Sequence, residues 1–202
     1  KFRSGETNKL SIENSMAEKK RCQWPSDDRL MIEYHDKEWG LPVHDDQLLF
    51  EYLVLDAFQA GLSWRTVLYK RENFRKAFDN FNAKKIAKYT QQDENKLLQN
   101  AGIIRNKLKI KATITNAQKF LEVQREFGSF DKYIWQFTKH KIIKNKHQKL
   151  GDIPATSPES DVMSIDLKKR GFKFVGSTIC YAFMQAAGMV NDHIIDCFRY
   201  RK

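Results

Sequence analysis

The sequence predicts an all-α fold, with a single helical domain over residues 21–202. Three observations support this class. Apolar residues recur at helical spacing through most of the chain, and Ser, Asp, Asn and Gly stand where the predicted helices begin and end. No stretch alternates apolar and polar residues cleanly enough to predict a sheet. At 202 residues the chain is long enough to bury one sizeable core.

The first two predicted helices lie on either side of a glycine. The run DDQLLFEYLVLDAFQAG begins at two good N-cap residues, Asp45 and Asp46, and ends at Gly61. The following run, residues 62–78, has the pattern of a second amphipathic helix that stops before the turn-like DNFN. We therefore expect two helices that meet at a tight turn.

Further helices are predicted from apolar spacing and from capping residues, and they cover residues 82–89, 92–102, 106–128 and 129–137. Gly102 and Gly128 are the expected C-caps of the second and third of these, and Ser129 is the expected N-cap of the last.

The segment 140–160 breaks the helical pattern with two prolines and clustered polar residues, and it is predicted to be a basic loop. Helical pattern resumes at Ser164 and is expected to run to the end of the chain.

The charge balance favours a polyanionic partner. Lys and Arg number 36 against 25 Asp and Glu, which gives a net charge of +11. The three cysteines are few and odd in number, which is not typical of a secreted disulfide scaffold, so a reducing cytoplasm fits better. Residues 1–20 contain no apolar segment typical of a signal peptide, and we expect them to form an extension outside the fold, with Met16 as a natural start.

The apolar run at residues 171–190 contains Lys173, Ser177, Thr178 and Gln185. These polar residues indicate a buried core helix, so no membrane span is expected there.

Four residues near the two ends of the chain could bind a metal ion. They are Cys22, His35, His193 and Cys197. On a helix, His193 and Cys197 would lie one turn apart on the same face. Two thiolates and two imidazoles suit tetrahedral Zn(II) in a closed structural site, which leaves no position for an activated water. An equally good interpretation makes Cys197 a small buried hydrophobe and His193 a helix-end residue bonded to a carbonyl.

Two turns are candidates for contact with a nucleic acid. In QAGLSW, Leu62 and Trp64 could point outward as wedges into a base stack, although the pattern favours an ordinary turn with both side chains in the core. In KKRGFKFVGSTICYAF, Gly171 and Gly176 indicate a hairpin between two helices. Four basic residues nearby favour a phosphate-binding surface over a solvated helix connection; they are Lys168, Lys169, Arg170 and Lys173.

Aromatic residues and one carboxylate complete the candidate site. Trp24, Tyr34, Trp39 and Trp64 are of the residue types that stack on a base, although aromatic side chains are more often core. Asp56 interrupts the apolar run YLVLDAF at a position expected to be buried. Because burial of an unpaired carboxylate is costly, Asp56 is either hydrogen-bonded for structure or kept for function.

Taken together, the ordered motifs RCQW, YHDKEWG, QAGLSW, AGIIRNKLKI, KKRGFKFVGSTICYAFMQAAG and VNDHIIDC resemble those of the 3-methyladenine DNA glycosylase I family, within the helix-hairpin-helix DNA glycosylase superfamily. The resemblance covers residues 22–197. It implies an all-helical fold, base-excision repair activity on alkylated adenine in double-stranded DNA, and a structural zinc ion.

Residue by residue, the resemblance places zinc on Cys22, His35, His193 and Cys197. It places the aromatic walls of the base pocket at Trp24, Tyr34 and Trp64, with Trp39 as a further member. It assigns Gly61 and Leu62 to the gap left by the extruded nucleotide, and the FKFVG turn, with Lys173 and Gly176, to the hairpin that anchors DNA.

Asp56 departs from the family pattern, in which the pocket carboxylate that reads the methylated base is a Glu. Asp keeps the charge but is one methylene shorter, so the contact would be longer or water-mediated. Asp192 falls near the catalytic Asp of related enzymes, but it adjoins His193, so we expect it first to support the metal site or a cap, and only second to act in catalysis. No lysine is placed for Schiff-base chemistry, which predicts a monofunctional hydrolase.

We therefore expect a monomeric, cytoplasmic, DNA-associated bacterial glycosylase. A non-catalytic, zinc-stapled module that binds DNA or recognises damage is the main alternative. A catalytic zinc hydrolase is a third, and it would need an open metal position.

Overall fold

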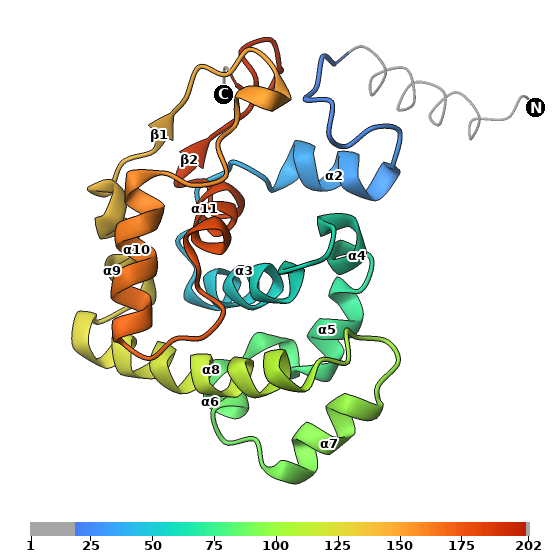
Figure 1. Ribbon diagram of the computed structural model, residues 1–202, viewed down its shortest axis with the longest axis vertical. Helices are drawn as coiled ribbons and strands as arrows, with labels where there is room; N and C mark the ends of the chain where they lie inside the picture. Colours follow the sequence, from blue (N-terminus) through green and yellow to red (C-terminus); the bar gives the residue numbers. More distant parts are fainter. Residues whose placement is uncertain (1–18, 201–202) are drawn as a thin grey trace, which may run out of the picture.

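The computed structural model describes residues 19–200. The predicted N-terminal extension therefore lies outside the described residues, except for Lys19 and Lys20. Ten α-helices make up most of this part of the chain (Figure 1), and their bounds are α2 Arg29–Lys37, α3 Asp46–Gln59, α4 Trp64–Leu68, α5 Arg71–Ala77, α6 Ala83–Ile86, α7 Gln91–Gln99, α8 Lys107–Phe127, α9 Phe130–Trp135, α10 Pro158–Lys169 and α11 Ser177–Ala186.

Short elements complete the described chain. The 3₁₀ turns η1 Asp79–Phe81, η2 Gln136–Thr138 and η3 Leu150–Asp152 connect helices, and β1 Ile143–Lys144 pairs in parallel with β2 Val190–Asn191. Each of these strands has only two residues, so the pair does not alter the all-α class. No helix within residues 19–200 has both the length and the apolar character needed to cross a membrane.

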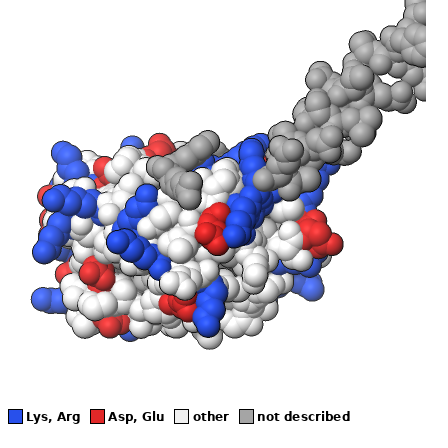
Figure 2. All heavy atoms as spheres, turned by 90° about the horizontal axis from the view of Figure 1, so that it is seen from above, with Lys and Arg blue, Asp and Glu red and all other residues white. Residues whose placement is uncertain are grey.

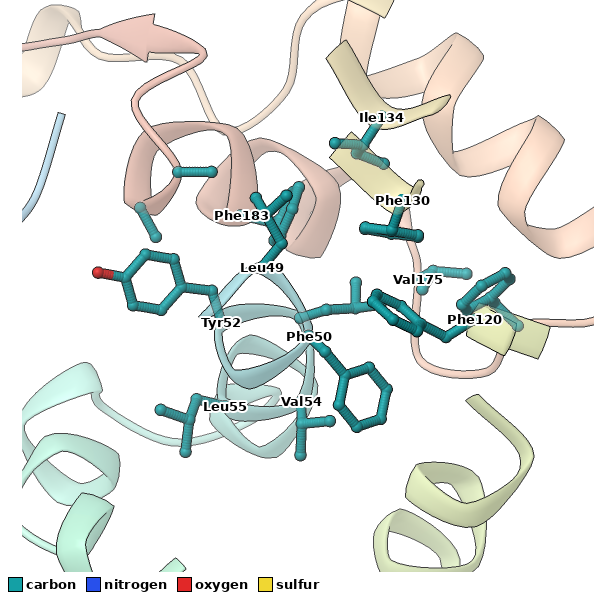
Figure 3. Close-up of a cluster of buried hydrophobic side chains, with 14 of the residues drawn as sticks. Leu49, Phe50, Tyr52, Val54, Leu55, Phe120, Phe130, Ile134, Val175 and Phe183 are labelled. Atoms are coloured by element: carbon teal, nitrogen blue, oxygen red, sulfur yellow. The ribbon is translucent and has the colours of Figure 1, made fainter. Parts of the chain in front are cut away.

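The central helix of the fold is α3. Asp45 caps it by accepting a hydrogen bond from the Leu48 N–H, as its place in the sequence predicts. Its residues from Leu49 to Phe58 are all buried, and Figure 3 shows side chains of α3 pointing to several sides, toward α8, α9 and α11. A helix that is buried on all its faces belongs inside the protein, so α3 is packed against its neighbours from Leu49 to Phe58.

The long helix α8 crosses one side of the molecule (Figure 1) and has the predicted bounds. Asn106 caps its first turn, and Gly128 ends it with φ +85°, a left-handed conformation that glycine adopts without strain. Helix α8 packs on α3, α6, α7 and α9.

Two predictions about helix bounds in the N-terminal half are wrong. Residues 62–78 form two helices, α4 and α5, because a turn at Tyr69 and Lys70 separates them. Val67, Arg71 and Phe74 nevertheless keep helical spacing on the buried side, which hides the break from the pattern. Gly102 is not the C-cap, since α7 ends at Gln99 with Asn100 as its C-cap, and the Asn100 side-chain oxygen accepts from the Gly102 N–H.

Helix α2 was missing from the sequence prediction. It buries only Met31, Tyr34 and His35, so its apolar face is narrow. Its start is marked by Asp28, whose carboxylate accepts hydrogen bonds from the Leu30 and Met31 N–H groups.

The C-terminal part also differs from prediction. Helix α10 begins at Pro158, six residues before the expected Ser164, and Ser157 caps it. After α11 the chain forms β2 and then irregular turns up to Tyr200, so the predicted helix through the end of the chain is absent. Helices α10 and α11 lie side by side and are joined by the predicted hairpin at residues 170–176 (Figure 1).

Candidate functional site: an aromatic pocket beside a buried Cys and His cluster

A pocket of about 330 Å³ opens among α2, α3, α4, η3 and α11. Its volume lies at the lower end of the range of about 300–1,000 Å³ found for small-molecule sites. Its lining residues are mostly apolar or aromatic, and they are Trp24, Met31, Tyr34, Trp39, Asp56, Gln59, Trp64, Leu150, Ile153, Ala182 and Gln185.

The pocket brings together the four aromatic residues and the carboxylate that the sequence singles out. Trp24 and Trp39 meet edge to face with ring centroids 5.2 Å apart, and Tyr34 and Trp64 lie 5.0 Å apart with tilted rings. Tyr34 and Trp39 are almost fully buried, whereas Trp24 and Trp64 are half-buried at the pocket wall. The sequence pattern favours Trp64 in the core, but the side chain also faces the pocket.

Asp56 reaches the pocket from the third turn of α3, where it is only 2% exposed. Burial raises the pKa of its carboxyl well above the ordinary value, and the positive charge of Arg71 opposes this only in part. The carboxyl is therefore kept neutral more readily than a surface aspartate, and a cation in the pocket would favour its ionised form.

Unpartnered polar atoms gather on the same residues. Within residues 19–200, four buried side-chain polar atoms lack a hydrogen-bond partner, and three of them belong to the pocket lining: Trp24 Nε1, Trp64 Nε1 and Asp56 Oδ2. Because a buried polar atom without a partner is costly, such atoms are rarely retained without a function. Two N–H donors and one acceptor thus remain available to a polar, flat ligand.

Next to the pocket, Cys22, His35, His193 and Cys197 form a buried cluster whose potential ligand atoms all lie within 4.8 Å of one another. Cys197 Sγ lies 3.5 Å from both His35 Nε2 and His193 Nδ1, and Cys22 Sγ lies 3.6 Å from His193 Nδ1. Zn–S bonds of about 2.3 Å and Zn–N bonds of about 2.0–2.1 Å at tetrahedral angles separate sulfur from nitrogen by about 3.5 Å. The cluster therefore has the size and donor set of a closed zinc site.

The second nitrogen of each histidine is held by a neighbouring acceptor. His35 Nδ1 lies 2.8 Å from Asp36 Oδ1, and His193 Nε2 lies 3.0 Å from the Trp39 carbonyl oxygen. Each acceptor favours the tautomer with a proton on the nitrogen that faces it, so that the other ring nitrogen is turned toward the cysteines. Arg21 in turn binds the Asp36 carboxylate, which fixes the orientation of His35.

His193 and Cys197 do not share a helix, contrary to the sequence prediction. They converge through turns instead, with the Cys197 N–H donating to the Ile194 carbonyl. The pKa of the Cys197 thiol is lowered, chiefly because the Cys22 thiol can donate a hydrogen bond to its sulfur.

The two predicted DNA-contact turns lie on elements that α8 holds in place. Gly61 has φ +79°, and Leu62 is 41% exposed at the tip of the turn after α3. The buried Lys109 ammonium donates to the Phe58 and Ala60 carbonyls and so caps the C-terminus of α3.

In the hairpin, the buried Asn116 side chain donates to the Lys173 carbonyl and accepts from the Lys173 N–H, at 3.0 Å and 2.7 Å. The Lys173 side chain remains exposed, and Gly176 is the N-cap of α11. The cap of α11 has no side-chain hydrogen bond.

The basic charge is distributed over the surface. In the face shown in Figure 2, Lys and Arg side chains are spread out with Asp and Glu among them, rather than gathered in one patch.

Asp192 does not line the pocket, although it was a candidate for a role there. Its fully buried carboxylate accepts hydrogen bonds from four side chains, namely Asn145, His147, Tyr181 and Gln185. These bonds join the loop before α10 to α11, and the role expected for Asp192 beside the metal site stays a prediction.

Sequence reasoning missed Met31, Gln59, Ala182, Gln185 and the two loop residues Leu150 and Ile153 as pocket-lining residues. Gln185 could have been found by the signal that marked Asp56, because it interrupts the apolar run YAFMQAAG. Leu150 and Ile153 carry no such signal, since isolated apolar residues in a polar loop are common.

Comparison with known proteins gives consistent results. A family model described as methyladenine glycosylase matches residues 24–200. The DNA-3-methyladenine glycosylase 1 of Escherichia coli K12 is 48% identical over 180 residues, which are 89% of this chain and 96% of that protein. The DNA-3-methyladenine glycosylase of Haemophilus influenzae is 48% identical over 177 residues, which are 88% and 96% of the two chains.

Solved structures agree in fold. A crystal structure of a 3-methyladenine DNA glycosylase I has a TM-score of 0.87 at 50% identity and covers 89% of this chain and 98% of its own. The Staphylococcus aureus 3-methyladenine DNA glycosylase I, solved to explain its recognition of 3-methyladenine, has a TM-score of 0.87 at 34% identity, with 90% and 97% covered.

Proposed function

The chain belongs to the methyladenine glycosylase family, and we propose that it hydrolyses the N-glycosidic bond of 3-methyladenine in alkylated DNA. The products are the free base and an abasic site, which makes the protein a monofunctional glycosylase of base-excision repair. Its partner is double-stranded DNA that carries alkylated adenine, and it acts as a cytoplasmic monomer.

The observation that carries this proposal is the buried, unpartnered carboxyl of Asp56 in a pocket walled by aromatic rings. Methylation at N3 makes adenine in DNA a cation. Each well-placed aromatic face attracts a cation by about 0.5–2 kcal/mol. Asp56 adds a negative charge that burial makes costly in the empty pocket and that the cationic base would stabilise. The pocket therefore favours the methylated base over neutral adenine.

The reaction needs little acid catalysis, because the cationic base leaves the sugar as a neutral molecule. A base inside a duplex is out of reach, so the nucleotide must first be extruded into the pocket. Water then attacks the sugar carbon as the glycosidic bond breaks, and its proton passes to solvent. Trp24, Tyr34 and Trp64 hold the base, while Asp56 complements the positive charge until the bond breaks.

The turn and the hairpin hold the duplex in this proposal. Leu62, exposed at the tip of a rigid turn, fills the gap that the extruded nucleotide leaves. Lys173 and the N-terminal amides of α11 at Gly176 bind backbone phosphates, because helix N-termini attract anions.

The Cys and His cluster binds a structural Zn(II) ion. The four donors and their spacing fit tetrahedral zinc, and with four protein ligands no position remains for water. The metal stabilises the fold at the place where the two ends of the chain meet. The residues of the pocket, and not the metal, are assigned to the reaction.

The test is the release of free 3-methyladenine from methylated duplex DNA, measured after separation of free bases, with 7-methylguanine in the same DNA as the comparison. We expect release by the parent protein and a large loss in Asp56→Asn and Trp64→Ala. The exposed Asp27 gives a matched control, since Asp27→Asn should keep the parental rate.

No release by the parent, with DNA binding retained, would favour a damage-recognition module without catalysis. Full turnover by both pocket variants would contradict the assignment of the pocket. A cobalt-substituted protein with a four-ligand tetrahedral absorption spectrum would support the closed metal site, whereas one with an exchangeable water would contradict it.

A further inference from the structure

Gln185 lies on the wall of the pocket in an orientation that its partner fixes. It follows Ala182 by one helical turn on α11, and both side chains are half-buried and line the pocket. The Gln185 side-chain amide donates from Nε2 to Asp192 Oδ2 at 2.8 Å. The Gln185 backbone carbonyl accepts from the Gly40 N–H at 2.9 Å, which ties the same residue to the segment that carries Trp39.

Asp192 can hold only one end of that amide. The Asp192 carboxyl oxygen accepts this hydrogen bond, so the NH₂ group of Gln185 faces it. Asp192 is itself immobilised, because it is fully buried and also accepts from Tyr181, Asn145 and His147. Among residues 19–200, no hydrogen bond engages Gln185 Oε1. A carbonyl oxygen with a fixed direction is therefore available at the pocket wall.

We propose that Gln185 determines the choice of base, by accepting a hydrogen bond from the exocyclic amine of an extruded adenine, and that Asp192 is the positioning residue that fixes its amide. This inference rests on the proposed function. Adenine has an amine at this edge, whereas guanine has the acceptor O6. An oxygen held toward the base thus accepts from adenine and repels guanine.

The other groups of the pocket do not make this distinction as firmly. Aromatic rings and a carboxylate respond to positive charge, and methylated guanines are cationic as well. The Asp56 carboxyl is also neutral more readily than usual, and a neutral carboxyl can donate to a guanine carbonyl. The Gln185 amide cannot turn its NH₂ group to a guanine without losing its bond to Asp192.

The direct test compares two free bases that differ only at this edge, 3-methyladenine and 3-methylhypoxanthine, which has a carbonyl in place of the amine. Binding is followed by the fluorescence of the pocket tryptophans. We expect the parent to bind 3-methyladenine more tightly than 3-methylhypoxanthine. Gln185→Met keeps the length of the side chain, and we expect it to reduce this preference about tenfold, which corresponds to one hydrogen bond of about 1.4 kcal/mol. Gln118→Met, at an exposed position of α8, is the matched control and should keep the parental preference.

The same proteins are then assayed for release of 3-methyladenine and 3-methylguanine from one alkylated DNA. Gln185→Met should shift the ratio of the two products toward 3-methylguanine. Asp192→Asn, which can donate as well as accept and so frees the amide to rotate, should shift the ratio in the same direction at unchanged metal content. If Gln185→Met is poorly folded by circular dichroism, Gln185→Ala replaces it.

The outcomes separate the two proposals. A parent that releases no base contradicts the proposed function, whatever Gln185 does. A parent that releases 3-methyladenine, together with a Gln185→Met protein that keeps the full preference for the amine, overturns the inference about Gln185. A shift in Gln185→Met without one in Asp192→Asn overturns the positioning role of Asp192.

Discussion

Replacement of Asp56 by Asn should stabilise the protein while it removes most of the activity. The carboxyl is 2% exposed, and its Oδ2 atom has no partner. A buried polar group without a partner costs about 1–3 kcal/mol. Asn keeps polar atoms at this site, so the gain comes from the cost of ionising a buried carboxyl, which the substitution removes; each kcal/mol recovered raises the melting temperature of a chain of this size by about 2–4 °C.

The pH dependence of stability gives an independent prediction of the direction in which Asp56→Asn changes the melting temperature. Because burial raises the pKa of Asp56 in the folded protein, the folded state binds this proton more tightly than the unfolded chain. The free energy of unfolding therefore falls as pH rises from the ordinary pKa of aspartate, about 3.9, through the raised value. Asp56→Asn removes that loss, so its advantage in melting temperature over the parent should grow with pH.

The activity should fall because Asp56→Asn removes the same negative charge whose burial destabilises the folded protein. A carboxylate about 4 Å from a cationic base, at an effective dielectric constant of about 20, contributes about 4 kcal/mol. Part of this is used to ionise the carboxyl, so we expect kcat/KM to fall between about 10-fold and 1,000-fold. The acid limb of the parental pH profile, set by Asp56, should disappear in the variant.

The assays are thermal melts at several pH values and the initial rate of 3-methyladenine release. An Asp56→Asn protein that melts below the parent at high pH would refute the assignment of an unpartnered buried carboxyl. One that keeps the parental kcat/KM would refute the role of the charge in binding the cationic base.

Three other variants test the remaining parts of the site. Cys197→Ser should lose bound zinc and about 3 kcal/mol of stability, or about 6–12 °C in melting temperature; one zinc per chain and an unchanged melt would argue against the site. Leu62→Ala should lower kcat/KM on duplex DNA about tenfold or more and leave the binding of free 3-methyladenine unchanged; an equal loss in both would place Leu62 in the base pocket. Lys173→Ala should reduce the slope of log K against log salt for DNA binding by about 0.9; the parental slope would show that this lysine meets no phosphate.

Among the sequence signals, helix-capping residues gave the most accurate bounds for the helices that hold the site. Asp45 begins α3, and Asn106 and Gly128 bound α8, because these residues satisfy the end groups of a helix locally. Helix α2 escaped prediction because it packs a narrow face on the metal cluster and the aromatic pocket. Its apolar partners come from α4 and from the far end of the chain, and sequence spacing does not contain that information.

The predicted site residues were those whose chemistry is unusual for their place in the sequence. Asp56 in an apolar helix and paired Cys and His residues are such cases. Gln185 has the same character, but it was interpreted only as a polar interruption that argues against a membrane span. Its role depends on Asp192, and only the fold brings the two side chains together.

The metal cluster and the pocket share their supports, so the metal need not react to matter for the chemistry. Trp39 lies in the pocket wall, and its carbonyl accepts from the metal-cluster residue His193. The next residue, Gly40, donates to the Gln185 carbonyl and lacks a side chain because a Cβ there would lie 3.0 Å from His193 Nε2. On the other side, Asp192 adjoins His193 and holds the Gln185 amide. We therefore expect a change in the cluster to affect both Trp39 and Gln185. The first link is the Trp39–Gly40 segment, and the second is Asp192.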